Sequence, residues 1–115
     1  MDIERIKTGP RMSQAVIYNK TVYLAGQVSA GATVAIQTRA ILAAIDGLLT
    51  EAGTDKSRLL SATIWLTDMA TFAEMNAVWQ SWVAQGAAPA RATVASPHLA
   101  SAEFKIEIAV IAAQP

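Results

Sequence analysis

The sequence predicts an α+β fold with the element order βββαβαββ, in which two helices cover one face of a sheet. Short runs rich in β-branched residues lie at both ends of the chain, and segments with a helical spacing of apolar residues lie between them. Strands and helices that do not strictly alternate along the chain are typical of α+β proteins. The length of 115 residues is that of one domain, which we expect to span residues 1–115.

The first half of the chain predicts three strands and a helix. Two β-branched and aromatic runs are separated by Asn19 and Lys20, a gap that suits a tight hairpin turn. Apolar residues then recur at helical spacing from Val34 to Leu48, and Gly53 follows as a stop. The predicted elements are strands over residues 3–7, 16–18 and 21–24 and a helix over residues 33–52.

The second half predicts a strand, a second helix and two further strands. Apolar and polar residues alternate over residues 59–67, as in a strand with two different faces. Thr71 and Glu74 match a capping box at the start of the second helix. The helix has an apolar stripe and ends before Gly86; the stripe consists of Phe72, Met75, Trp79 and Val83. Strands over residues 91–96 and 104–112 complete the order.

The last strand indicates what lies on each face of the sheet. Its first set of alternating side chains is apolar and is expected to meet the helices: Phe104, Ile106, Ile108 and Val110. The opposite set is half apolar: Lys105, Glu107, Ala109 and Ile111. Hydrophobic residues make up 53% of this short chain, so we expect this second face to meet another subunit.

Composition argues against several classes of function. Nine Lys and Arg residues balance nine Asp and Glu residues without a charged run, so we expect no nucleic-acid or membrane partner. Without cysteine and with one histidine, the chain lacks the usual ligands of a transition-metal site. No phosphate-binding glycine motif and no long apolar run occur. These features predict a cytoplasmic protein without a metal.

Among the charged residues of the predicted strands, two stand out as candidates for a site, Arg91 and Glu107. Arg91 has no other charge near it in sequence, and its guanidinium suits bidentate binding of a carboxylate. Glu107 lies between two isoleucines and could orient a water molecule. Alternatively, the two residues form a structural ion pair, or each lies on a solvated edge. His98 is interpreted as a solvated loop residue, and Asn76 either faces solvent or belongs to a site.

Three segments resemble the Rid family of reactive-intermediate deaminases, also called the YjgF/YER057c/UK114 family. The first contains Gly9-Pro10 and the Leu-Ala-Gly-Gln run that ends at Gln27. The second runs from Asp68 through Asn76 to Trp79, and the third contains Pro-Ala-Arg-Ala-Thr-Val followed by Lys-Ile-Glu-Ile. The resemblance covers nearly the whole chain and implies a chorismate-mutase-like homotrimer with a central β-barrel and clefts between subunits.

The resemblance also assigns roles to individual residues. Arg91 matches the substrate-carboxylate arginine, and Glu107 matches the glutamate that positions water. Asn76 matches an asparagine near the cleft, and Gly26 matches a glycine whose backbone lies beside the ligand. Thr93 stands where the family often has cysteine, and its backbone amide is expected to help bind the carboxylate.

Two further departures concern the polarity of the pocket. Arg11 replaces an aromatic residue that often lines the pocket, and it either enters the pocket or points to solvent. Ala25 replaces a serine, which removes one hydroxyl from the site.

The resemblance implies hydrolysis of small enamine or imine acids, such as 2-aminoacrylate or 2-iminopropionate, to 2-keto acids and ammonia. This reaction requires no metal or organic cofactor. A second hypothesis is a non-catalytic protein of the same fold that binds small carboxylates or a partner. A third, ribonuclease or translation inhibitor, has no support from a basic patch.

Overall fold

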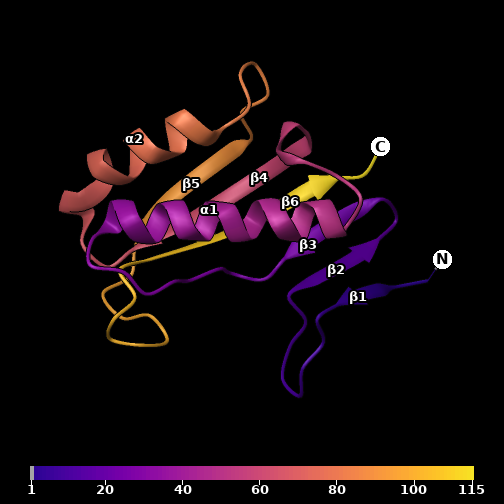
Figure 1. Cartoon of the computed structure of the whole chain (residues 1–115), viewed down its shortest axis with the longest axis horizontal. Helices are drawn as coiled ribbons and strands as arrows, with labels where there is room; N and C mark the ends of the chain where they lie inside the picture. The colour runs from indigo at the N-terminus through magenta and orange to yellow at the C-terminus, as the bar shows by residue number, and fades with distance from the viewer. Residues whose placement is uncertain (1) are drawn as a thin grey trace.

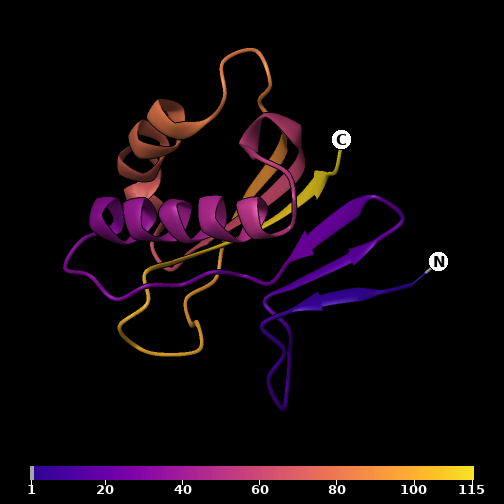
Figure 2. The same cartoon turned by 45° about the vertical axis from the view of Figure 1, so that its right-hand side comes forward.

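The computed structural model describes residues 2–115 and confirms the predicted element order. One mixed sheet has the strand order β1-β2-β3-β6-β4-β5, and both helices lie on the same side of it (Figures 1 and 2). The molecule measures 43 × 37 × 20 Å, and its short dimension corresponds to one layer of sheet and one of helices. The strands are β1 (Glu4–Ile6), β2 (Ala15–Tyr18), β3 (Thr21–Leu24), β4 (Leu59–Leu66), β5 (Ala90–Ala95) and β6 (Ile106–Ala113); the helices are α1 (Val34–Glu51) and α2 (Phe72–Trp82).

The hairpin between β2 and β3 turns at the two residues expected from the sequence. Asn19 and Lys20 have φ angles of 51° and 57°. Two consecutive residues with positive φ match the twist of the flanking strands in a tight hairpin, and asparagine tolerates this conformation well. The hairpin therefore follows from local sequence.

Helix α1 begins and ends close to the predicted positions. The Thr33 side chain accepts a hydrogen bond from the Ile36 amide at 3.1 Å, and Gly53 adopts a φ of 78° just after the helix. Gln37 is fully buried in the first turns of the helix. Its amide donates to the carbonyl oxygens of Gly31 and Glu103 and accepts from the Lys105 amide, each at 2.9 Å. It thus ties α1 to the loop before β6.

The capping box predicted for α2 is wrong. Thr71 forms no side-chain cap on this helix, because its hydroxyl donates to the Asp68 carbonyl oxygen in a preceding 3-10 turn, η2 (Met69–Thr71). The Glu74 carboxylate instead accepts the Ala35 amide of α1 at 2.8 Å. A carboxylate at the start of α1 offsets the unpaired amides and the helix dipole there, so Glu74 caps the neighbouring helix.

The parallel pair β4 and β5 is joined by α2, while β6 runs antiparallel between β4 and β3. Strand β6 starts at Ile106, two residues later than predicted, because the Phe104 amide closes a turn onto the Ser101 carbonyl oxygen. The β6 side chains that face the helices are buried; they are Ile106, Ile108, Val110 and Ala112. The other face of the sheet carries half-buried and exposed apolar side chains, among them Tyr23, Trp65, Val94 and Ile111.

The helices are too short or too polar to cross a membrane. This holds for residues 2–115, which the structure describes.

Candidate functional site

Arg91 lies on β5, one of the two edge strands, and points to the helix side of the sheet. Its register partner in β4 is Ala62, which is buried beneath the helices. The guanidinium lies under α2, with its central carbon 5.8 Å from the ring centre of Phe72 and 5.5 Å from that of Trp79. Nη1 donates a hydrogen bond to the Asn76 side-chain oxygen at 2.8 Å. One face of α2 therefore fixes the guanidinium through two aromatic rings and one amide.

The Arg91 charge has no protein counter-ion in the part of the chain that the structure describes. No carboxylate lies within 4.0 Å of the guanidinium, and Asn76 receives only one of its five N–H groups. A half-buried cation without a counter-ion is costly, and a planar fork of free donors is suited to a carboxylate. Arg91 and Glu107 form no ion pair within the described residues of one chain, so the alternative of a structural ion pair is wrong for the single chain.

Thr93 adds a second polar group on the same side of β5. It lies two residues beyond Arg91 and pairs with Ile64, another residue that faces the helices. Its hydroxyl oxygen is buried and has no hydrogen-bond partner among the described residues. A buried hydroxyl without a partner loses its hydration without compensation. Arg91, Asn76 and Thr93 form what we call the arginine cluster.

Glu107 lies on β6 and points to the opposite face of the sheet. It is paired with Trp65 of β4 and is half-buried, whereas Ile106 and Ile108 face the helices. The carboxylate rests against the backbone of Gly26. A Cβ atom at position 26 would lie 2.8 Å from the carboxyl carbon of Glu107 and closer still to Oε2, so this packing requires glycine.

The arginine cluster and Glu107 do not meet within one chain. Arg91 is on the helix side of the sheet, Glu107 is on the open side, and strand β4 lies between their strands. A single ligand can therefore touch both groups only if they come from different subunits. The single chain leaves room for such a contact, because β5 is an edge strand and the face that carries Glu107 is uncovered.

Arg11 and His98 lie outside both groups of side chains. Arg11 is exposed in the connection between β1 and β2 and forms no hydrogen bond or ion pair within residues 2–115. His98 is exposed in the loop between β5 and β6, which confirms its interpretation as a solvated loop residue. No group of three or more potential metal ligands occurs among the described residues.

Sequence reasoning missed the aromatic flank of Arg91 and the pairing of Trp65 with Glu107. Phe72, Asn76 and Trp79 follow one another at intervals of four and three residues, so they share one face of a helix. That spacing could have shown that Phe72 and Trp79 contribute to the site as well as to the core.

Comparison with known proteins identifies the family. Residues 3–114 match the family model described as Endoribonuclease L-PSP. The RutC family protein YoaB of Escherichia coli is 42% identical over 114 residues, which cover 98% of this chain and 99% of that protein. The chain belongs to the YjgF/RutC family.

Solved structures of YjgF/RutC relatives have the same fold. NMB1025 of Neisseria meningitidis, a member of the YjgF protein family, is 46% identical with a TM-score of 0.97, covering 100% of this chain and 97% of that one. YyfA of Yersinia pestis, of the conserved Rid protein family, is 28% identical with a TM-score of 0.91, covering 97% of this chain and 99% of that one. The resemblance to the Rid family and the α+β architecture are thereby confirmed.

Proposed function

We propose that this YjgF/RutC family protein hydrolyses small enamine and imine acids to 2-keto acids and ammonia. The observation that carries the proposal is Arg91, a half-buried guanidinium that Asn76 fixes at 2.8 Å and that has no counter-ion within the described chain. Such a group is suited to the carboxylate of a 2-imino acid.

Binding through Arg91 would fix the position of the reacting carbon. The α-carboxylate is bonded directly to the imine carbon, so a bidentate contact holds that carbon at a set distance from the guanidinium. The unpartnered Thr93 hydroxyl lies on the same side of β5 and would donate a hydrogen bond to the carboxylate.

Glu107 would then act on water. Its carboxylate takes a proton as the water oxygen adds to the carbon of the protonated imine, which gives a neutral carbinolamine. Return of that proton to the nitrogen makes ammonia the leaving group. The C–N bond then breaks as the carbinolamine hydroxyl gives its proton back to the Glu107 carboxylate, so that ammonia leaves and the 2-keto acid remains. Positioned general acid–base catalysis of this kind contributes about 10²- to 10⁴-fold in rate.

The reaction needs at least two chains, because Arg91 and Glu107 lie on opposite faces of one sheet. We propose a homotrimer in which the open sheet faces form a central β-barrel and each cleft combines Arg91 of one subunit with Glu107 of the next. The apolar side chains on that face, such as Tyr23 at 45% and Val94 at 41% exposure, would be buried by such an assembly. We further propose a cytoplasmic location, which suits a chain without cysteine.

The test generates imino acids with an amino-acid oxidase and follows their capture by a competing amine. The wild-type protein is expected to reduce capture, and Arg91→Ala is expected to lose this effect while remaining folded and assembled. Arg39→Ala, which removes an exposed arginine on α1, serves as the matched control. Equal activity of wild type and Arg91→Ala would reject the hydrolase. Stabilisation by carboxylates without turnover would instead show a non-catalytic binding protein.

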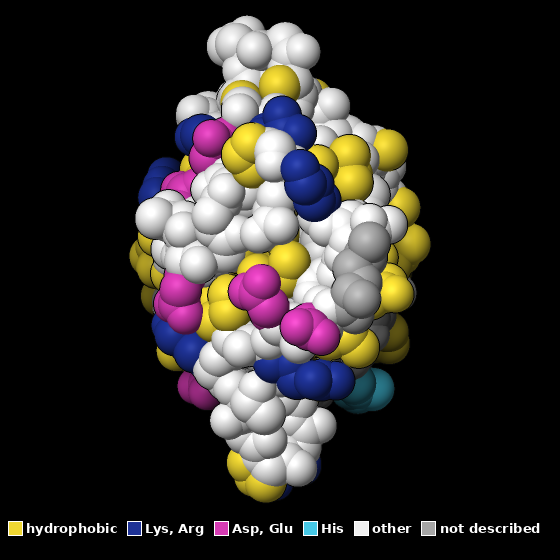
Figure 3. Space-filling model, turned by 90° about the vertical axis from the view of Figure 1, so that its right-hand side faces the viewer, with side chains coloured by type: hydrophobic (Ala, Val, Ile, Leu, Met, Phe, Trp, Pro, Cys, Tyr) yellow, Lys and Arg dark blue, Asp and Glu magenta, His cyan; other side chains and the backbone are white. Residues whose placement is uncertain are grey.

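The description of the matching family model raises a ribonuclease as the competing activity. Figure 3 shows Lys and Arg intermixed with Asp and Glu on the face it presents, and the formal net charge of the chain is zero. RNA binding depends largely on neutralising phosphates with clustered cations. We therefore favour the imine hydrolase, and RNA cleavage that survives purification and is lost in Arg91→Ala would reverse this preference.

A further inference from the structure

A hollow of about 540 Å³ lies on the helix side of the sheet. It is bounded by α1, by the two ends of the connection that joins β1 to β2 in a second hairpin, and by the segment that follows β3. Its lining residues are Lys7, Gln14, Gln27, Ala44, Gly47, Leu48 and Glu51, and we call it the hairpin–helix hollow. It lies toward the β1 end of the strand order, whereas the arginine cluster lies at the β5 edge. Its volume is within the range of about 300–1,000 Å³ that is usual for small-molecule sites.

The wall that α1 contributes leaves space because two of its four lining residues, Ala44 and Gly47, have little or no side chain. Ala44, Gly47, Leu48 and Glu51 are spaced so that they share one face of the helix. A Cβ atom at Gly47 would meet no atom within 4 Å apart from the neighbouring residues and backbone of its own helix. The helix thus leaves room for an aliphatic group a few carbon atoms in size.

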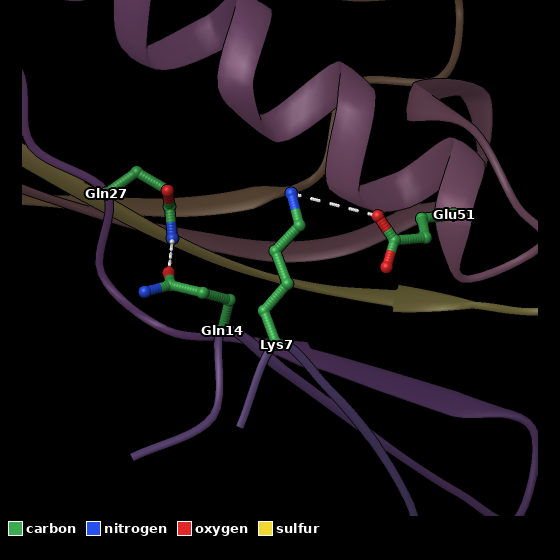
Figure 4. Close-up of polar contacts among 4 residues, drawn as sticks. All are labelled: Lys7, Gln14, Gln27 and Glu51. Atoms are coloured by element: carbon green, nitrogen blue, oxygen red, sulfur yellow. Dashed lines mark hydrogen bonds and ion pairs between the residues drawn. The ribbon is translucent and has the colours of Figure 1, made fainter. Parts of the chain in front are cut away.

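Two opposite charges lie at the rim of the hollow (Figure 4). Lys7 Nζ is 3.8 Å from Glu51 Oε1, with side-chain exposures of 62% and 48%. This distance is longer than the 2.7–2.9 Å of a charge-assisted hydrogen bond. An exposed pair at such a distance contributes little to stability, so both groups can turn to a ligand at small cost.

Gln27 adds an acceptor whose orientation is fixed by its other contacts. Its side-chain nitrogen donates to Gln14 Oε1 at 2.9 Å and to the Ala25 carbonyl oxygen at 3.0 Å. A backbone carbonyl can only accept, which fixes the amide so that Oε1 points away from it. No protein donor among residues 2–115 reaches this oxygen. In the view of Figure 4 it lies on the side of the amide away from Gln14, to the left of the Lys7 amine.

The Lys7 backbone holds its side chain over the hollow in an uncommon conformation. Its φ angle is 53°, in the left-handed region that residues other than glycine rarely adopt. Residues held in this region often serve a site.

We propose that the hairpin–helix hollow binds the zwitterion of an α-amino acid with a small aliphatic side chain. The α-carboxylate would contact the Lys7 amine, and the α-ammonium would contact the Glu51 carboxylate and Gln27 Oε1. The side chain would lie against Ala44, Gly47 and Leu48. A ligand whose ammonium and carboxylate are bonded to the same carbon suits this rim, because a simple anion would be repelled by Glu51 and a simple cation by Lys7.

Isothermal titration calorimetry with L-alanine and L-valine on the full-length protein tests the site. Propionate and propylamine, which each carry one of the two charges, are expected to bind at least tenfold more weakly. Lys7→Gln and Glu51→Gln are each expected to weaken amino-acid binding about tenfold or more. Lys20→Gln is the matched control, because Lys20 is also exposed, has a φ of 57° and lies outside the hollow; it should bind as wild type does.

A second variant separates loss of the site from loss of the fold. Gly47→Leu fills the hollow from a helical position with open space around it, so it should abolish binding without lowering the midpoint of thermal unfolding. Arg91→Ala should retain binding, whatever its hydrolase activity. Absence of binding at millimolar amino acid, equal affinity in Lys7→Gln and Lys20→Gln, or loss of binding in Arg91→Ala alone would each overturn the proposal. Deaminase activity is scored separately, so failure of one proposal leaves the other intact.

Discussion

Arg91 and Glu107 project from opposite faces of the same sheet, on strands that are separated by β4. Each has its own neighbours: α2 holds the guanidinium through Asn76, and the carboxylate lies against the Gly26 backbone. The two halves of the proposed site are therefore built independently, and only association of subunits can join them.

This arrangement predicts complementation between two inactive variants. Arg91→Ala retains Glu107, and Glu107→Gln retains Arg91, so mixed oligomers contain some clefts with both groups. With equal amounts and random assembly, each cleft has a chance of about one half for either intact group, so about one quarter of wild-type activity should return. The variants are mixed after reversible dissociation, and imine hydrolysis is measured before and after. Absence of recovery in verified mixed oligomers would contradict a shared cleft.

Asn76 is predicted to position Arg91 for substrate binding. Asn76→Ala removes a charge-assisted hydrogen bond worth about 1.5–3 kcal/mol, which corresponds to a loss of about 10- to 100-fold in kcat/KM. Asn76→Asp supplies the missing counter-ion and should raise KM still further, because its carboxylate competes with that of the substrate. Steady-state kinetics check both variants. Gln80→Ala changes an exposed residue on the same helix and should leave both constants unchanged; unaltered kinetics of Asn76→Asp would refute the positioning role.

Local patterns predicted the elements well because their causes are local. The hairpin follows from Asn19 and Lys20, and the ends of α1 follow from Thr33 and Gly53. The predicted capping box is absent because the Glu74 carboxylate accepts the Ala35 amide in the first turn of α1, 39 residues away in the sequence. That contact depends on helix packing, which a four-residue motif does not contain.

The two site residues differ in how far sequence could place them. Glu107 alternates with large apolar residues, so its position on the face away from the helices was predicted and is confirmed. Arg91 lies in a short strand among small residues, Ala90, Ala92 and Thr93. They show no alternation of apolar and polar side chains that would indicate which face Arg91 is on. Only the parallel register with Ala62 reveals its face. The separation of the two groups therefore could not be predicted from the sequence.

Gly26 is predicted to be required for the position of Glu107. In Gly26→Ala, the new methyl group would lie 2.8 Å from the Glu107 carboxyl carbon, so the carboxylate must move away. We expect a loss of about 10²-fold or more in kcat, the scale of a lost general base, in a folded and assembled protein. Gly47→Ala is the control, because its methyl group enters open space and alanine is favoured over glycine in helices by up to about 1 kcal/mol. Full activity of Gly26→Ala would show that the carboxylate does not need this position.

Asp55 is predicted to make stability depend on pH in the acid range. Its carboxylate accepts hydrogen bonds from the side chain and backbone of Ser57 at the start of a 3-10 turn, η1 (Lys56–Arg58). These bonds, together with the nearby Arg58 charge, lower the pKa of Asp55 from the ordinary 3.8. The stabilisation is complete above the unfolded-state pKa and is lost as pH falls through the lower, folded-state pKa. Wild type should therefore be more stable than Asp55→Asn at pH 7, and the difference should vanish in strong acid.

Urea unfolding at a fixed protein concentration, measured between pH 7 and pH 2.5, checks this prediction, since the stability of an oligomer depends on concentration. Ser57→Ala removes the largest cause of the lowered pKa while retaining the backbone amide. Its stability should consequently depend less on pH than that of wild type and more than that of Asp55→Asn. Parallel stability curves for wild type and Asp55→Asn across this range would show that the Ser57 contacts do not favour the charged carboxylate in the folded protein.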